Sequence, residues 1–243
     1  MSAPIVEVDY GWDFKVLILE DRWVLRVPRH QLAVEELQKE TLLLPAIADR
    51  LPVQIPRFAH VSREPLYVIY PLIRGDRYTN EDPLGVRAFL DALHAVPVDE
   101  VPAPHPEWLE TYREQADEFR RVVLPLLDRD ERPRGEALLG EVETLTDFRP
   151  ALTHSDIAPT HLLVQDDKLA GVIDWGDARI GDPAIDYAWL LNQPFPDWDV
   201  EDELRRRARF YYRLAPWFDV HYGDFTNQPA WVESGLRGVR ERL

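Results

Sequence analysis

Two short segments of the chain combine residue types that could catalyse a reaction of a phosphate group. The first, residues 154–163, places Asp156 five residues before His161, and the second, residues 173–177, carries Asp174. An aspartate on a loop, a possible metal ligand five residues further on and a second aspartate just beyond a hairpin could meet at one point. Such a cluster could position a nucleophile and hold Mg2+ beside phosphate oxygens. Each residue alone has a plain structural explanation, since Asp156 could cap a turn and Asp174 could end a strand, and only their combined spacing favours chemistry.

The elements expected to carry these segments follow from the pattern of apolar residues. Apolar runs on both sides of a short polar connector predict two β-hairpins, and spacing by three or four residues predicts helices. The expected order in the first part is hairpin, helix, strand, at residues 14–19 with 23–27, 32–51 and 66–70. After Gly75 helical patterns dominate, at residues 84–95, 106–128, 135–146 and most of 182–243, with the second hairpin at 162–165 and 169–173.

The composition excludes several classes of partner. The 243 residues include 44 acidic and 28 basic side chains, a formal net charge of -16, and 45% are hydrophobic, as in a folded globular protein. The negative excess argues against nucleic acid or anionic membranes as partners, because binding to them depends on Lys and Arg. The chain has no cysteine, hence no disulfide and no thiol nucleophile. No apolar run approaches the ~20 residues of a membrane span and no export signal is evident, so we expect a cytoplasmic protein.

Three motifs, in this order and spacing, resemble the aminoglycoside/macrolide phosphotransferase family of small-molecule kinases. The His-Ser-Asp run at 154–156 matches the family's catalytic loop, usually His-Gly-Asp, and Asp174 within Ile-Asp-Trp matches its metal-binding aspartate. The Asp-Pro-Ala-Ile-Asp run at 182–186 matches the segment that follows. The resemblance implies an α+β, protein-kinase-like fold of two lobes. A small antiparallel β-sheet lobe, residues 1–73, would bind nucleotide, and a mainly helical lobe, residues 74–243, would carry the catalytic loop and the substrate cleft.

His161 indicates which members of the family the chain resembles. Most members of the wider family have Asn five residues after the catalytic Asp, whereas macrolide 2'-phosphotransferases and aminoglycoside 2''-phosphotransferases commonly have His there. Imidazole is an unusual ligand for Mg2+, which prefers oxygen, so metal affinity is expected to weaken when His161 is protonated. A packed histidine making one hydrogen bond is the alternative.

The resemblance also implies a role for each residue of the two segments. Asp156 is expected to be catalytic, orienting the acceptor hydroxyl and taking its proton, and His161 and Asp174 are expected to hold Mg2+. His154 would brace the loop, and Asp186 would accept backbone N–H bonds from it.

Five residues of the first lobe are expected to bind the nucleotide. Arg26 stands where protein kinases have their phosphate-contacting Lys, and Glu40 stands where its ion-pair partner lies. A solvated helix face is the alternative for Glu40. Counting back from Gly75, Tyr70 would gate the base pocket, while Pro71 would offer a carbonyl and Ile73 an N–H to a purine. Family members with a bulky Tyr at the position of Tyr70 often use GTP, so the resemblance favours GTP without excluding ATP.

The expected activity is Mg2+-dependent transfer of phosphate from GTP or ATP to a hydroxyl of an antibiotic of macrolide or aminoglycoside type. Two alternatives stay open: a kinase of a small amino-alcohol or sugar metabolite, and a nucleotide-binding regulator without catalysis. Residues 10–14, with a single glycine, would replace a phosphate-covering loop. The oligomeric state is left open, with a monomer favoured.

The charge distribution favours a cationic small-molecule substrate. Residues 1–73 contain ten acidic and eight basic side chains, which leaves 34 and 20 of the totals for the rest of the chain. An acidic field attracts cations. The acidic cluster at 197–203 could meet substrate amino groups, or it could simply begin a helix whose later turn carries the bases at 205–207.

Overall fold

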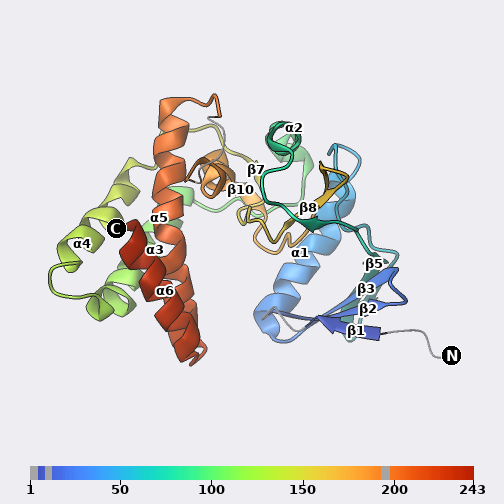
Figure 1. Cartoon of the computed structure of the whole chain (residues 1–243), viewed down its shortest axis with the longest axis horizontal. Coiled ribbons are helices and arrows are strands. Elements are labelled where there is room, and N and C mark those ends of the chain that lie inside the picture. Colours follow the sequence, from blue (N-terminus) through green and yellow to red (C-terminus); the bar gives the residue numbers. More distant parts are fainter. Residues whose placement is uncertain (1–4, 9–12, 193–197) are drawn as a thin grey trace. The chain divides into compact units, whose positions relative to one another are not determined.

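The computed structural model describes residues 5–8, 13–192 and 198–243 (Figure 1). The chain divides into two compact units. The first unit is Met1–Pro104 with Ala151–Ile180, and the second is His105–Pro150 with Gly181–Leu243. The expected lobe boundary after residue 73 is a different division of the chain, and it stays a prediction.

The first unit contains a five-stranded antiparallel sheet in the order β1-β2-β3-β5-β4. The predicted hairpin is present as the antiparallel pair β2 and β3. Glu20 and Asp21 between the two strands have φ of 54° and 51°, the left-handed conformation that suits a tight hairpin turn. The two outer strands, β1 and β4, were not predicted. The strands are β1 Ile5–Val8, β2 Phe14–Leu19, β3 Trp23–Pro28, β4 His60–Arg63 and β5 Leu66–Pro71.

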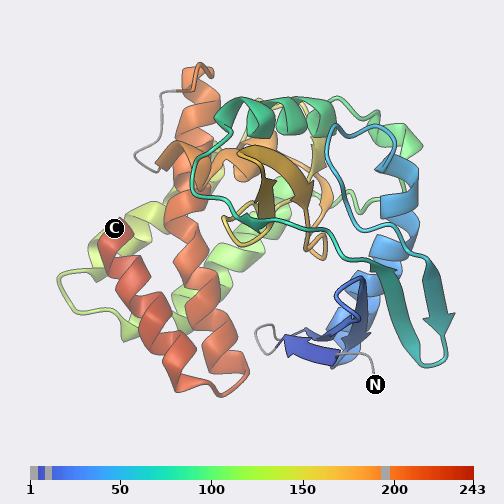
Figure 2. The same ribbon diagram turned by 45° about the vertical axis from the view of Figure 1, so that its right-hand side comes forward.

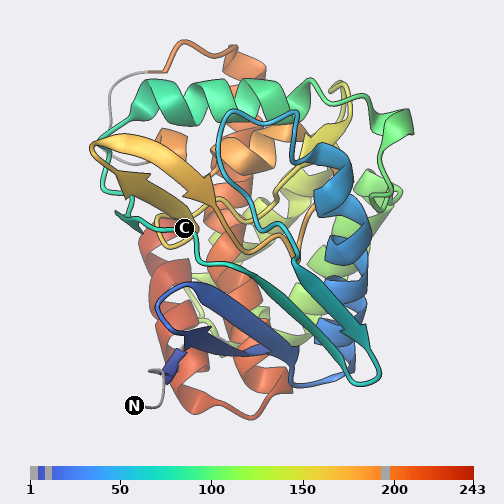
Figure 3. The same cartoon turned by 90° about the vertical axis from the view of Figure 1, so that its right-hand side faces the viewer.

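The helix α1 (Gln31–Ile47) packs on this sheet (Figure 3). It ends four residues before the expected position. Apolar side chains of β2, β3, β5 and α1 form the shared core, namely Phe14, Val24, Ala33, Leu37, Val68 and Tyr70. The same helix carries Glu40, so this packing decides where that carboxylate lies.

The second hairpin of the first unit was also predicted. Strands β8 (Leu162–Gln165) and β9 (Lys168–Val172) pair with β6 (Asp76–Arg77) in a three-stranded sheet. Helix α2 (Pro83–His94) lies beside this sheet (Figure 2), and its N-cap Asp82 also accepts the backbone N–H of Leu169 at 3.1 Å. The short strands β7 (Ala151–Thr153) and β10 (Arg179–Gly181) pair with each other, and Val98–Glu100 is a short 3-10 turn.

The second unit consists of helices. The antiparallel pair α5 and α6 is prominent in Figure 2, in orange and red. Trp217 and Tyr211 of α5 are buried, so these aromatics belong to the core rather than to a binding surface. The acidic residues Asp202 and Glu203 form the first turn of α5, as in the helix-start interpretation of that cluster, and Asp197 lies outside the described residues. The elements are α3 Trp108–Val122, Leu124–Leu126, α4 Arg132–Gly140, Glu141–Thr144, Pro183–Tyr187, Leu190–Asn192, α5 Asp202–Phe225 and α6 Pro229–Arg242.

The predicted α+β class, with one small antiparallel sheet and a largely helical remainder, is confirmed. Residues 10–12 of the expected phosphate-covering segment lie outside the described residues. Within the described part of the chain, none of the helices has both the length and the apolar character needed to cross a membrane.

Candidate active site

The segment that follows β7 is held by a buried histidine. His154 is fully buried, its Nδ1 accepts the backbone N–H of Asp156 at 3.3 Å, and its Nε2 lies 3.0 Å from the carbonyl oxygen of Ile173. Because Nδ1 accepts, Nε2 carries the proton and donates to Ile173. One imidazole therefore ties the loop of Asp156 to the residue just before Asp174, which agrees with the bracing role expected for His154.

The three residues predicted to do the chemistry converge. His161 Nδ1 lies 2.8 Å from the backbone carbonyl oxygen of Asp156 and 3.3 Å from Asp156 Oδ2. His161 Nε2 lies 3.5 Å from Asp174 Oδ2. A neutral His161 that donates from Nδ1 to the Asp156 carbonyl presents the lone pair of Nε2 beside the Asp174 carboxylate. The carboxylates of Asp156 and Asp174 are 48% and 50% exposed, so solvent and ligands can reach both.

The backbone is in an unusual conformation at Asp174 and at Ser155, the residue before Asp156. Ser155 and Asp174 have φ of 68° and 66°, in the left-handed region that glycine adopts without strain. At Ser155 side-chain bonds accompany this conformation: Arg179 Nε donates to Ser155 Oγ, Ser155 Oγ lies 2.8 Å from Thr153 Oγ1, and Thr153 Oγ1 donates to the Arg179 carbonyl oxygen. Since the single hydroxyl hydrogen of Thr153 is used on Arg179, Ser155 donates to Thr153. The sequence pattern did not indicate these hydrogen bonds around Ser155. Ser155 occupies the position at which the family's catalytic loop usually has glycine.

Arg26 and Glu40 form the buried ion pair that the resemblance implied. Arg26 Nη1 lies 2.8 Å from Glu40 Oε2, and Arg26 Nη2 lies 3.7 Å from Asp174 Oδ1. Arg26 is 5% exposed and Glu40 is fully buried, so the solvated alternative for Glu40 is wrong. Burial raises the pKa of Glu40, and the opposing charge of Arg26 lowers it. The guanidinium also stacks on the ring of Phe14, 4.0 Å from its centre.

Of the three residues expected at the base pocket, Tyr70 and Pro71 end β5 and Ile73 lies two residues beyond it. Tyr70 is buried, its ring meets Phe58 edge to face, and burial raises the pKa of its hydroxyl to about 12. Pro71 pairs with Trp23 across the sheet. The N–H of Leu72 is bonded to the carbonyl of Arg22 at 2.8 Å, so it is used within the sheet, and the next residue, Ile73, is buried. Recognition of a purine by these residues stays a prediction.

A second charged group near Asp174 was not predicted. Glu36 on α1 is half-buried, and burial together with the negative charges of Asp13 and Asp177 raises its pKa to about 7. Burial also raises the pKa of Asp13, although an ion pair with His30 opposes this. Their sequence context gave no signal, because the carboxylates come from three separate segments.

The donor set fits a magnesium ion that is bound together with phosphate. Mg2+ usually takes one or two protein ligands and completes its shell with water and phosphate oxygens. Asp174 offers an accessible carboxylate and His161 offers a nitrogen lone pair beside it. Among residues 5–8, 13–192 and 198–243, no group of three or more His, Asp or Glu side chains could hold a metal without further ligands.

A small antiparallel sheet with its helix, a buried Arg–Glu pair and two accessible aspartates define a protein-kinase-like phosphotransferase. The model of the phosphotransferase enzyme family matches residues 4–221. The chain belongs to this family, which confirms the family and the enzyme class predicted from the motifs.

Two curated proteins are similar to this chain in sequence. The uncharacterized protein YcbJ of Bacillus subtilis is 24% identical over 212 residues, which is 73% of this chain and 66% of that protein. Viomycin phosphotransferase of Streptomyces vinaceus is 32% identical over 90 residues, 35% of this chain and 30% of that protein. The matches thus span less than two thirds of either relative.

Solved structures share the fold. The GDP and kanamycin complex of an aminoglycoside 2''-phosphotransferase superposes with a TM-score of 0.86 at 23% identity, covering 100% of this chain and 94% of the other. Macrolide 2'-phosphotransferase MphH from Brachybacterium faecium gives 0.76 at 22% identity, covering 97% and 91%. These likenesses support the kinase-like fold over the whole chain.

Proposed function

We propose that this protein is a small-molecule kinase that transfers the γ-phosphate of GTP or ATP to a hydroxyl group of an aminoglycoside or macrolide type of antibiotic. The observation that carries the proposal is the convergence of Asp156, His161 and Asp174, with Arg26 beside Asp174. Phosphoryl transfer depends mainly on positioning and on charge stabilisation, and this group supplies both.

Asp156 is the catalytic residue of the proposal. Its carboxylate is accessible, and its loop is fixed by His154 and His161. It accepts the proton of the acceptor hydroxyl while the hydroxyl oxygen bonds to the γ-phosphorus, and the bond from that phosphorus to the leaving nucleoside diphosphate breaks. Because the transition state is loose, orientation of the hydroxyl matters more than the basicity of Asp156.

Arg26, His161 and Asp174 would hold the nucleotide and its metal. The guanidinium of Arg26 is kept in place by Glu40 and offers further N–H groups to phosphate oxygens. Asp174 and His161 would bind Mg2+, which neutralises charge on the phosphates when it is bound. Tyr70 at the expected base pocket favours GTP, and the GDP complex of the related fold is consistent with a guanine nucleotide.

Two observations support the substrate class: the names of related proteins and the acidic charge of this chain after residue 73. Three of the four proteins named above are, by their names, phosphotransferases of viomycin, aminoglycosides or macrolides. The excess of 34 acidic over 20 basic residues after residue 73 favours a cationic acceptor. A monomer in the cytoplasm, where nucleoside triphosphates are available, suits this activity.

The test replaces Asp156 by Asn and measures nucleoside diphosphate release with GTP or ATP against aminoglycosides, macrolides and small amino alcohols or sugars. We expect turnover with an antibiotic, and a fall in kcat of roughly 10²–10⁴-fold in Asp156→Asn, with nucleotide binding retained. Asp166→Asn is the matched control, because Asp166 lies in the exposed β8–β9 turn at φ 51°, which Asn tolerates.

Other outcomes identify the alternatives. Turnover only with amino alcohols or sugars would replace the antibiotic by a metabolite. Binding of nucleotide without transfer to any acceptor, in a protein whose Asp156→Asn variant behaves like the wild type, would refute catalysis and favour a regulator.

A further inference from the structure

Helix α1 presents two charged side chains, Glu36 and Lys39, to the turn that follows Asp174. Glu36, Lys39 and Glu40 lie on one face, since their spacing is three and four residues. Glu40 reaches Arg26, as described above. The Nζ of Lys39 donates a hydrogen bond to the carbonyl oxygen of Gly176, although the two residues are 137 positions apart in the chain.

Glu36 brings the same helix face against the same glycine. A Cβ atom placed on Gly176 would lie 3.2 Å from Glu36 Oε2, so the carboxylate and the glycine are in close contact. Lys39 is half-buried between Glu36 and Asp177, and burial lowers its pKa while these two carboxylates raise it. The helix therefore contacts the turn through two neighbouring side chains.

The turn needs such an anchor because Asp174 is strained and exposed. Its φ of 66° is unfavourable for a residue with a side chain. On one side the turn is held by the buried Trp175, whose Nε1 donates to the carbonyl of Val172 at 3.1 Å. On the other side the hydrogen bond from Lys39 to Gly176 holds it. A bond to a backbone carbonyl two residues away limits rotation of the turn without touching the carboxylate.

We infer that Lys39 is a positioning residue for Asp174, acting through the carbonyl of Gly176. The inference rests on the proposed function, because it assigns to Asp174 the binding of magnesium and nucleotide. Lys39 does not touch the reacting groups; it keeps the Asp174 carboxylate beside His161 and Arg26. Loss of Lys39 therefore lowers the affinity for nucleotide in the presence of Mg2+ and leaves the affinity for metal-free nucleotide unchanged.

The test compares Lys39→Met with the matched control Lys168→Met. Lys168 is on β9, and its side chain is 77% exposed. Calorimetry measures the affinity for GDP once with Mg2+ and once with a chelator. In Lys39→Met we expect the affinity for GDP with Mg2+ to fall about tenfold, as for other residues that orient a metal ligand, and the affinity for metal-free GDP to stay unchanged. Lys168→Met should match the wild type in both, and Lys39→Arg, which keeps a donor and the charge, should recover part of the loss.

Equal affinity losses with and without Mg2+, or no loss in either, would overturn the positioning role. If Lys39→Met does not fold, Lys39→Gln takes its place, with the same split expected. These results are separable from a failure of the proposed function, which is read from phosphate transfer by the wild type. A wild type that binds GDP more tightly with Mg2+ but transfers no phosphate would refute the proposed reaction and still test Lys39.

Discussion

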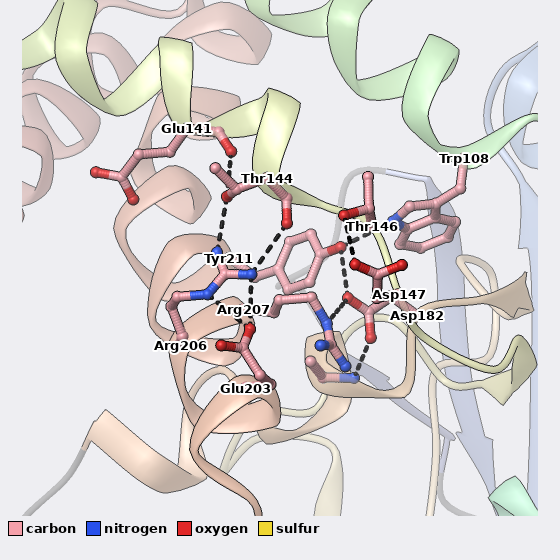
Figure 4. Close-up of polar contacts among 11 residues, drawn as sticks. Trp108, Glu141, Thr144, Thr146, Asp147, Asp182, Glu203, Arg206, Arg207 and Tyr211 are labelled. Atoms are coloured by element: carbon pink, nitrogen blue, oxygen red, sulfur yellow. Dashed lines mark hydrogen bonds and ion pairs between the residues drawn. The ribbon is translucent and has the colours of Figure 1, made fainter.

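Replacing Asp182 by Asn removes the negative charge from a buried network of the second unit (Figure 4). Asp182 Oδ2 accepts hydrogen bonds from Arg207 Nε at 2.7 Å and from the Tyr211 hydroxyl at 3.1 Å. Asp182 Oδ1 accepts the N–H of Ala184 at 3.0 Å, and Trp108 Nε1 donates to the Tyr211 oxygen at 2.8 Å. Asp182 is fully buried and Arg207 is 5% exposed. The side-chain amide of the variant keeps one oxygen that accepts hydrogen bonds. Its NH2 group faces the donors Arg207 and Tyr211 if it replaces Oδ2, or the N–H of Ala184 if it replaces Oδ1.

The size of the effect follows from the charge that is left behind. Breaking a buried ion pair on one side costs about 3–5 kcal/mol, because the remaining charge stays out of water without a partner. In Asp182→Asn the guanidinium of Arg207 is that charge. Replacing both members by apolar residues, Asp182→Leu with Arg207→Met, removes the stranded charge, so the double variant should lose less than the sum of its own single variants, Asp182→Leu and Arg207→Met. We expect a coupling free energy of about 1–3 kcal/mol.

Urea unfolding, followed by fluorescence of the eight tryptophans and by circular dichroism, measures these free energies. Asp130→Asn, at an exposed position of the same unit, is the control and should change stability by less than about 0.5 kcal/mol. A loss below about 1 kcal/mol in Asp182→Asn, or strictly additive single variants, would refute the view that this network stabilises the second unit.

Three further substitutions test other parts of the structure. The pKa of Glu36 is raised to about 7, so its protonated form favours the folded state at low pH and this contribution is lost as the pH rises through about 7. Glu36→Gln should therefore flatten the decline in melting temperature between about pH 5 and pH 8, and an unchanged slope would contradict the assignment. A Cβ on Gly181 would lie 1.9 Å from the ring of Trp108, whereas one on Gly140 meets nothing within 4 Å. Gly181→Ala should lower stability by about 1–3 kcal/mol and Gly140→Ala should not, so equal melting temperatures would count against the packing described. Glu40→Gln removes the buried counter-charge of Arg26 on β3 and leaves only the half-exposed Asp174 carboxylate at 3.7 Å, so it should cost about 3 kcal/mol in urea unfolding, the low end for a broken buried pair, with weaker nucleotide binding; a variant as stable as the wild type would argue against a charged pair there.

The two hairpins could be predicted because their information is local. Each has apolar runs of strand length on both sides of a short polar connector, and the connector residues adopt left-handed φ values in both cases. The strands β1 and β4 could not be predicted. Val6 of β1 and Val61 of β4 are exposed, so backbone pairing with β2 and β5 rather than a buried apolar face makes these segments strands.

The candidate site also has contacts that could be predicted from local sequence and contacts that could not. The spacing of Asp156 and His161 spans a single loop, so their proximity could be expected from the motif alone. The contact of Lys39 with Gly176 joins segments far apart in sequence, and it exists because α1 packs on the sheet. No local pattern distinguishes Lys39 from an ordinary solvated helix residue.

The sequence by itself determined the family, the class of fold and the order of the motifs, since these are written in residue types at fixed spacing. The tertiary structure alone decided which charged residues are buried and which carboxylates are accessible. Glu36 and Glu40 are one helical turn apart on α1, yet Glu40 pairs with Arg26 in the core, whereas burial raises the pKa of Glu36 to about 7. The free energy of a charge depends on its distance to water and to other charges, and those distances are set by packing between segments that are remote in the chain.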